Sequence, residues 1–215
     1  SSDVGLMLNG WTEDLGRELW IYTVAPVNDD PTLDQPDNLT VDEDAPEQTV
    51  DLTGITAGGG ETQPLRVTAS SSNTDLIADT TIVYTSAEST GFLSFTPLAD
   101  QHGTTTITVT VEDGGLDNNL ATSADNATIT QTFDVTVNSV NNLPTLAAIS
   151  DLAIDEDASG QTVNLTGITA GPNENQPLRV TATSDNTNLI PNPAVTYTSA
   201  DTTGSISFTP LADQH

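Results

Sequence analysis

The sequence repeats itself after 113 residues, and this period limits the folds that are open to the chain. Residues 31–102 align with residues 144–215 without a gap, at an offset of 144 − 31 = 113, and 46 of the 72 aligned positions are identical. An internal repeat of this kind indicates a row of similar structural units. The length of the unit suits one β-sandwich domain, which has about 100 residues.

Apolar and polar residues alternate within each unit. In the run 104–112, Ile107, Val109 and Val111 alternate with threonines, and a period of two predicts a strand with one buried face. Threonine suits the other face, because its branched side chain fits the pleat. The same pattern predicts seven strands in the first unit, at 38–42, 48–53, 64–70, 80–86, 91–96, 104–112 and 127–138. No helical period is sustained, so the fold class is all-β.

The period also places the domain boundaries. Residues 31–143 form one complete unit, which we call repeat 1, and residues 144–215 form repeat 2, which is truncated before its last two strands. Residues 1–30 align with 114–143 at the same offset, so they are expected to be the closing strand or strands of a preceding domain, or an N-terminal β-segment. We therefore expect the chain to start and end inside a domain.

The N-terminal segment carries the pattern of a closing strand. Trp20, Tyr22 and Val24 fall where repeat 1 has Phe133, Val135 and Val137. A second strand is expected at Val4–Leu8, joined to the first by a turn over Asn9–Asp14.

Composition excludes several classes of function. The chain has 31 acidic and three basic residues, a net charge of −28, and no cysteine, so it repels nucleic acids and anionic membranes and has no thiol chemistry. No apolar run approaches the roughly 18 residues of a membrane span. His102 and His215 occupy the same repeat position and are expected to be structural. Arg66 and Arg179 also repeat, and each is expected to pair with a carboxylate of its own unit. No catalytic motif is visible, so an enzyme is not expected.

The motifs of the unit resemble a known family. "VNDDPT" (27–32), "VDEDA" (41–45), "FTPLADQHG" (95–103) and "ITVTVEDGG" (107–115) together resemble bacterial cadherin-like tandem repeats. "GRELWIYT" (16–23) resembles the Glu-Leu-Trp modules found upstream in such proteins. The resemblance implies seven-stranded Greek-key sandwiches of the immunoglobulin type, in a large secreted or cell-surface protein.

The resemblance also implies Ca²⁺ at the junctions between repeats, bound by carboxylate and amide oxygens. The positions that match the family's ligands are Glu43, Asp100, Asp29, Asp30, Asp113, Asn138, Asn141 and Asn142, together with Asn28. The family's paired aspartates are replaced by Thr56-Ala57-Gly58 and again by Thr169-Ala170-Gly171. One weak site is therefore expected in place of a three-ion junction.

Three functions remain open on the sequence. The first is a non-catalytic structural or adhesion module of an extracellular bacterial protein, with neighbouring repeats and surface or matrix ligands as partners. The second is a filament subunit, in which the strand-donor segment with Trp20, Tyr22 and Val24 completes repeat 2 of a neighbouring copy. A window cut from a longer array would have the same complementary ends. The third is a carbohydrate-binding module that uses Trp11 and Trp20.

Overall fold

The structure is a computed structural model, and it describes residues 6–12, 16–22, 25–78 and 80–214. Within these ranges the chain forms strands and no helix, so the all-β prediction is confirmed. It follows that the described part holds no apolar helix that could span a membrane. The chain divides into two compact units, residues 1–139 and 140–215, and each is described by itself.

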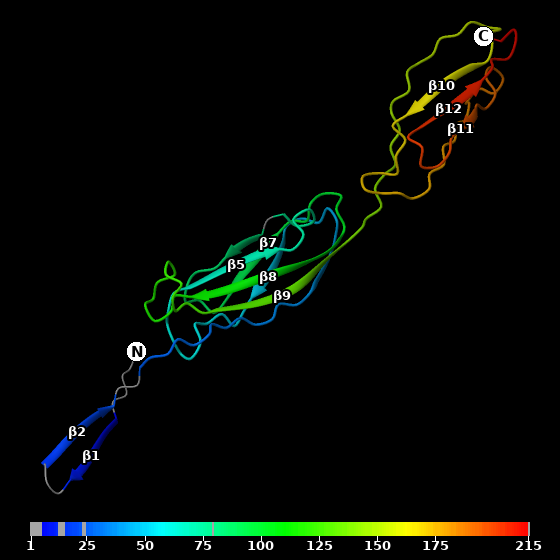
Figure 1. The fold of residues 1–215 in the computed structure, drawn as a ribbon. Coiled ribbons are helices and arrows are strands. Elements are labelled where there is room, and N and C mark those ends of the chain that lie inside the picture. The colour runs from blue at the N-terminus through cyan, green and yellow to red at the C-terminus, as the bar shows by residue number, and fades with distance from the viewer. Residues whose placement is uncertain (1–5, 13–15, 23–24, 79, 215) are drawn as a thin grey trace. The chain divides into compact units, whose positions relative to one another are not determined.

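The N-terminal segment forms a hairpin of two antiparallel strands, β1 (Leu6–Thr12) and β2 (Gly16–Tyr22) (Figure 1). β1 continues through Asn9–Thr12, where the sequence predicted the start of a turn. The backbone of these four residues pairs with Gly16–Leu19, and this pairing outweighs the local turn preference of asparagine and glycine.

Repeat 1 contains the seven predicted strands. They are β3 (Leu39–Asp42), β4 (Gln48–Leu52), β5 (Leu65–Ser71), β6 (Thr80–Val83), β7 (Gly91–Phe95), β8 (Gly103–Asp113) and β9 (Thr128–Asn138). The largest difference from the prediction is at β6, which ends at Val83 and not at residue 86. A turn begins directly after it, closed by the bond from Glu88 N–H to the Thr85 carbonyl at 3.0 Å.

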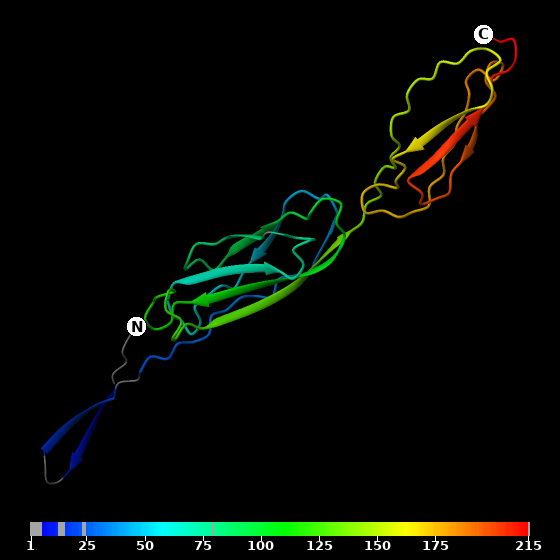
Figure 2. The ribbon, with the colours of Figure 1, turned by 45° about the horizontal axis from the view of Figure 1, so that its top comes forward.

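These strands form the two layers of a Greek-key sandwich (Figures 1 and 2). One sheet has the order β3-β9-β8-β5 and the other has the order β4-β7-β6. β3 and β9 pair in parallel, and all other pairs are antiparallel. The chain changes sheet after β3, β4, β5 and β7, which ties the two layers together.

The core lies between the two sheets. Alternate residues of β8 and β9 are buried, while the threonines between them lie toward the outer face. The opposite sheet and the loops add large aliphatic side chains to the same cluster. Its fully buried members include Leu52, Ile55, Leu76, Ile77, Leu93, Ile107, Val109, Val111, Phe133 and Val135.

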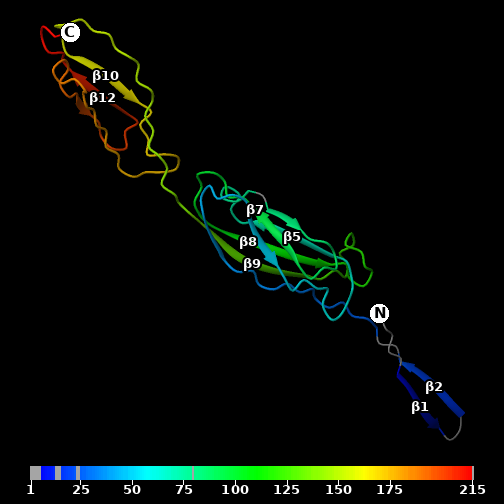
Figure 3. The same cartoon turned by 180° about the vertical axis from the view of Figure 1, so that it is seen from behind.

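Repeat 2 contains only one of the two sheets. Its strands are β10 (Gln161–Thr166), β11 (Ala194–Thr196) and β12 (Thr203–Phe208), in the order β10-β12-β11. This sheet is the counterpart of β4-β7-β6, and its register is the same after a shift of 113: Gln48 pairs with Phe95, and Gln161 pairs with Phe208. Figure 3 shows β10 and β12 side by side.

The counterparts of β3 and β5 in repeat 2 are residues 152–155 and 178–184, and neither segment is a strand. In repeat 1, β3 pairs with β9 and β5 pairs with β8. The counterparts of β8 and β9 would follow His215, the counterpart of His102, so no such strands are among the described residues of repeat 2. An extended segment without a partner leaves its backbone groups to water, and a strand does not form.

Candidate functional site: the polar ends of repeat 1

The residues predicted to bind calcium lie at two opposite ends of repeat 1. Asp113 is the last of the 11 residues of β8, whereas Asp100 precedes its first residue, Gly103. Eleven extended residues span about 35 Å, so these two carboxylates cannot share an ion. Asp29, Asp30 and Asp113 lie at one end, the linker end, and Glu43, Asp100 and Asn138 lie at the far end. Asn141 and Asn142 belong to the second unit.

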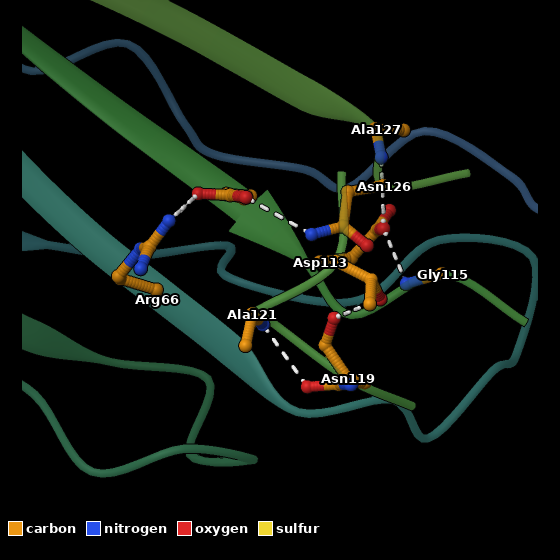
Figure 4. A network of polar contacts seen from close by, with 9 residues as sticks. Arg66, Asp113, Gly115, Asn119, Ala121, Asn126 and Ala127 are labelled. Carbon is orange, nitrogen blue, oxygen red and sulfur yellow. Dashed lines mark hydrogen bonds and ion pairs between the residues drawn. The ribbon is translucent and has the colours of Figure 1, made fainter. Parts of the chain in front are cut away.

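Asp113 is the buried centre of the linker end, with no exposed surface. Its Oδ1 accepts hydrogen bonds from the backbone N–H groups of Gly115 and Ala127, each at 2.9 Å (Figure 4). The side-chain amide of Asn28 donates to Oδ1 and Oδ2, at 3.2 and 3.3 Å. Two carboxylate oxygens thus receive four N–H···O contacts, which compensate the loss of water around a buried charge.

Gln63 connects the linker to the loop after β4. Its side-chain amide donates to Oδ1 of Asn28 and, at 2.9 Å, to Oε2 of Glu61. The same Glu61 oxygen accepts the backbone N–H of Asp29 at 3.2 Å. Asn28, Glu61, Gln63 and Asp113 therefore form one hydrogen-bonded group, which we call the linker clamp.

The glycine loop beside the clamp lies against the linker backbone. Gly58 has a φ of +88°, and a Cβ atom there would lie 2.2 Å from the carbonyl oxygen of Asp30. The next residue, Gly59, has a φ of +46°, and a Cβ atom there would lie 1.8 Å from Oδ2 of Asp29. At Gly58 only glycine fits, because a Cβ atom would strike the backbone of the linker.

The linker before repeat 2 makes the same contacts. Oδ1 of Asn141 accepts the amide of Gln176 at 3.0 Å, and that amide also donates to Oε2 of Glu174. The backbone N–H of Asn142 donates to Oε1 of Glu174. Each of these residues lies 113 positions after its counterpart in the linker clamp. The counterpart of Asp113 is lacking, and the amide of Asn141 donates to the carbonyl of Asn142 at 3.1 Å.

The far end holds a second buried carboxylate. Glu43 is 4% exposed, and its Oε2 lies 3.5 Å from Nδ1 of His102, whose side chain is 44% exposed. The backbone N–H of Glu43 donates to the carbonyl of Asn138 at 2.8 Å. Asp100 donates its backbone N–H to Oδ1 of Asp44 at 3.0 Å. His102 therefore contacts a structural carboxylate and no nucleophile.

The fit to a metal ion differs between the two ends. Within the described ranges, no three Asp, Glu or His side chains gather closely enough to hold an ion. At the linker end, the oxygens of Asp113 already accept N–H donors, and Asn28 turns its amide nitrogen toward them. Calcium takes oxygen ligands only, so this arrangement does not fit it. At the far end, Glu43 and Asp100 come from separate loops, and calcium there stays a prediction.

Arg66 forms the expected ion pair within its own repeat. Its guanidinium contacts Oε2 of Glu112, with an Nε–Oε2 distance of 3.1 Å (Figure 4). The amide of Asn126 donates to the other oxygen of Glu112 at 3.0 Å. The Asn126 hydrogen bond, followed by that of Arg66, lowers the pKa of Glu112. For Arg179, no ion pair is found in the part of the chain that the structure describes.

A surface hollow of about 510 Å³ lies over the β4-β7-β6 sheet. Tyr84 and Phe92, which is 38% exposed, line it together with Asp51 and Glu88. The Tyr84 hydroxyl donates to the carbonyl of Glu88 at 3.0 Å, and burial raises the pKa of Tyr84. Aromatic faces beside carboxylates can bind a sugar, but the hollow holds no nucleophile paired with a base.

Several predicted residues fall outside what the structure describes. Val24 lies outside the described ranges, and so do the side chains of Trp11, Trp20 and Tyr22. The sequence pattern pointed to Asn28 but not to Gln63, which joins Asn28 to Glu61. The signal was present, because Gln63 recurs as Gln176 within the repeated run "QPLRVTA".

No family model and no curated protein matches this chain. Solved structures with a similar arrangement include domains 4 and 5 of the S-layer protein SbsC, at 18% identity and a TM-score of 0.35. That alignment covers 56% of this chain and 59% of the SbsC chain, which is less than two thirds of its length.

Two further similar structures contain tandem domains. Titin domains Z1Z2, in a complex with telethonin, align at 12% identity and a TM-score of 0.34, over 86% of this chain and 84% of that one. The tandem Ig repeats of Dlar align at 10% identity and a TM-score of 0.33, over 83% and 82%. At these TM-scores the likeness carries no argument, and the fold class rests on the strand topology described above.

Proposed function

We propose that this chain is a non-catalytic structural and adhesive module, of the cadherin-like type, in a large extracellular or cell-surface protein. The observation that carries the proposal is the tandem repeat with a recurring linker contact. Repeat 1 is a closed sandwich whose preceding linker is bound to its end, and the linker before repeat 2 is bound in the same way. A net charge of −28 favours solubility and mutual repulsion of such arrays.

Immunogold electron microscopy of the cells that make the protein tests this function. Antibodies raised against the chain are expected to label the cell surface or the surrounding matrix, before any permeabilisation. Labelling confined to the cell interior would contradict the proposal.

The second candidate is a filament subunit that donates its N-terminal hairpin to repeat 2 of the next copy. The register favours it, because Leu8 pairs with Trp20 in the hairpin as Ile107 pairs with Phe133 in repeat 1. Trp20 and Phe133 are also 113 residues apart. The hairpin thus offers a two-stranded unit in the register of the β8–β9 pair that repeat 2 lacks, a form of strand addition.

Sedimentation velocity distinguishes these two functions. A donating hairpin predicts concentration-dependent polymers that Trp20→Lys abolishes, because a lysine at that position would enter the neighbour's core. Trp11→Lys is the matched control. Position 11 lies three residues after Leu8, which pairs with Trp20, so it is on the opposite face of the hairpin. A monomer at all concentrations would leave the repeat module as the only candidate of the two.

A carbohydrate-binding function would be located at the hollow over Tyr84 and Phe92. A glycan array probes it directly, with Phe92→Ala as the variant that removes the exposed ring. An array without a binder would remove this alternative.

Calcium binding is proposed for the far end alone, through Glu43 and Asp100. Extracellular modules often bind Ca²⁺ with affinities of about 0.1–1 mM. Calorimetric titration with calcium chloride is expected to give a weak binding heat that Glu43→Gln abolishes. No binding heat from the unmodified chain would contradict calcium binding at the far end.

A further inference from the structure

We propose that the linker clamp locks the preceding linker onto repeat 1 without any metal ion. In this arrangement, the side-chain amides of Asn28 and Gln63 take the place that a cation would have among the carboxylates. The inference concerns how a junction is stiffened and goes beyond the structural role proposed above.

The direction of the hydrogen bonds carries the first step. The Nδ2 atom of Asn28 faces three oxygens, both of Asp113 and the carbonyl of Asp125, the last at 3.0 Å. The hydrogens of an amide NH₂ group carry partial positive charge, and they stabilise a carboxylate that accepts hydrogen bonds from them. Asp113 is fully buried, so this charge must be compensated inside the protein.

The second step is a chain of hydrogen bonds that leads from Asn28 to the backbone of the linker. Oδ1 of Asn28 accepts the amide of Gln63, which is 6% exposed. Gln63 also binds Glu61, and Glu61 binds the backbone of Asp29. The linker is therefore held through one side chain and one backbone group, both anchored on repeat 1.

The contacts recur in repeat 2. Asn141, Glu174 and Gln176 reproduce the contacts of Asn28, Glu61 and Gln63 in a unit with a different surrounding structure. The contacts between linker and loop thus belong to the repeat itself, and the buried aspartate adds the final anchor.

The glycine loop lies where the resemblance would place a further pair of carboxylates. Where related repeats are expected to place paired aspartates, this chain has Thr56-Ala57-Gly58. A Cβ atom at Gly58 would lie 2.2 Å from the carbonyl oxygen of Asp30, so an aspartate there would displace the linker. At this position the loop and the linker pack backbone against backbone.

Hydrogen exchange of the linker amides in the full-length chain tests the proposal. The peptide that covers residues 25–32 is expected to exchange equally slowly in chelator and in millimolar calcium. Asn28→Ala is expected to raise its exchange roughly tenfold in both solutions, because hydrogen bonds to a charged group are lost. Asn188→Ala, at an exposed position of repeat 2, is the matched control and is expected to change nothing in this peptide.

A second variant keeps the test decisive. Asn28→Asp places a carboxylate against Asp113, so the linker is expected to loosen in chelator and to regain protection when calcium is added. Linker protection of the unmodified chain in calcium but not in chelator would overturn the proposal. A linker that exchanges freely in both solutions would also overturn it, while leaving the cell-surface role to the immunogold result.

Discussion

Repeat 1 and repeat 2 contain nearly the same heptapeptide in two different structures. Residues 65–71 read LRVTASS and residues 178–184 read LRVTATS, so six of seven positions are identical. The first is strand β5, whereas the second is not a strand. Since the local sequence is the same, the difference lies in the partner, because β5 pairs with β8 and the second heptapeptide has no such neighbour. Strand formation in this fold is decided by pairing and not by local propensity.

The burial of equivalent leucines also depends on whether the neighbouring strands are present. Leu33 is 6% exposed in repeat 1, whereas its counterpart Leu146 is 49% exposed. By contrast, Leu52 and Leu165 are both buried, at 1% and 2%. Leu52 and Leu165 belong to the three-stranded sheet that both repeats contain in full. A side chain is thus protected in repeat 2 where its neighbours are present, and it is exposed where they are lacking.

The largest expected effect comes from truncating one leucine in each repeat. Leu33→Ala is expected to lower the free energy of unfolding of repeat 1 by roughly 2–5 kcal/mol, because it opens a cavity in a closed core. Leu146→Ala removes a half-exposed side chain, and we expect a loss of less than about 1 kcal/mol. Urea titrations followed by circular dichroism measure both values. Equal losses would contradict the contrast in burial.

The contact of Gly58 with the linker is a feature that the repeats share, because a Cβ atom at Gly171 would lie 2.7 Å from Cβ of Asn142. Gly58→Ala is expected to destabilise repeat 1 by roughly 2 kcal/mol, since the new Cβ strikes the linker carbonyl. Gly60→Ala is the control, because its φ of +84° is similar but no atom lies within 4 Å of a Cβ there. It should cost only the roughly 1 kcal/mol of a left-handed alanine. Equal melting temperatures for the two variants would mean that the close contact between Gly58 and the linker has no effect on stability.

The two repeated arginines give a smaller contrast. Arg66 pairs with Glu112 through a side chain that is 51% exposed, so Arg66→Gln is expected to cost about 0.2–1 kcal/mol. Arg179→Gln is expected to cost nothing measurable, because no ion pair of Arg179 is found among the described residues. The same urea titrations test both variants. A larger loss for Arg179→Gln would mean that repeat 2 has a partner for this arginine.

The smallest expected effect is a pH dependence confined to repeat 1. The pKa of Glu112 is lowered by Asn126 and then by Arg66, so its ionised form is favoured in the folded state. A lowered pKa contributes stability above the ordinary value of 4.5, and this contribution is lost as the pH falls through the lowered pKa. Glu112→Gln should therefore destabilise repeat 1 at neutral pH, and this effect should shrink progressively as the pH falls below 4.5. A difference that persists or grows on acidification would contradict this assignment.

Alternation in the sequence was sufficient to predict all seven strands of repeat 1, because each long strand buries one face. The pattern could not predict that residues 178–184 lack a strand, since that outcome depends on the distant segment that pairs with them. Asp113 was predicted to be a calcium ligand, whereas the structure shows it as a buried acceptor of hydrogen bonds. Sequence alone does not reveal that the amide of Asn28 points toward it, because this orientation depends on Gln63 and Asp125.

Hydrogen exchange of the two matched heptapeptides tests the central claim most directly. Residues 65–71 and 178–184 differ at one position, so their intrinsic exchange rates are nearly equal, and any difference reports structure. We predict that the amides of 65–71 directed at β8 are protected, while those of 179–183 exchange close to the intrinsic rate; Leu178 and Ser184 donate their N–H groups to Ser199 and Asn192 and are left out of the comparison. Equal protection of the two segments would contradict the account, because it would mean that repeat 2 forms this strand without the partner found in repeat 1.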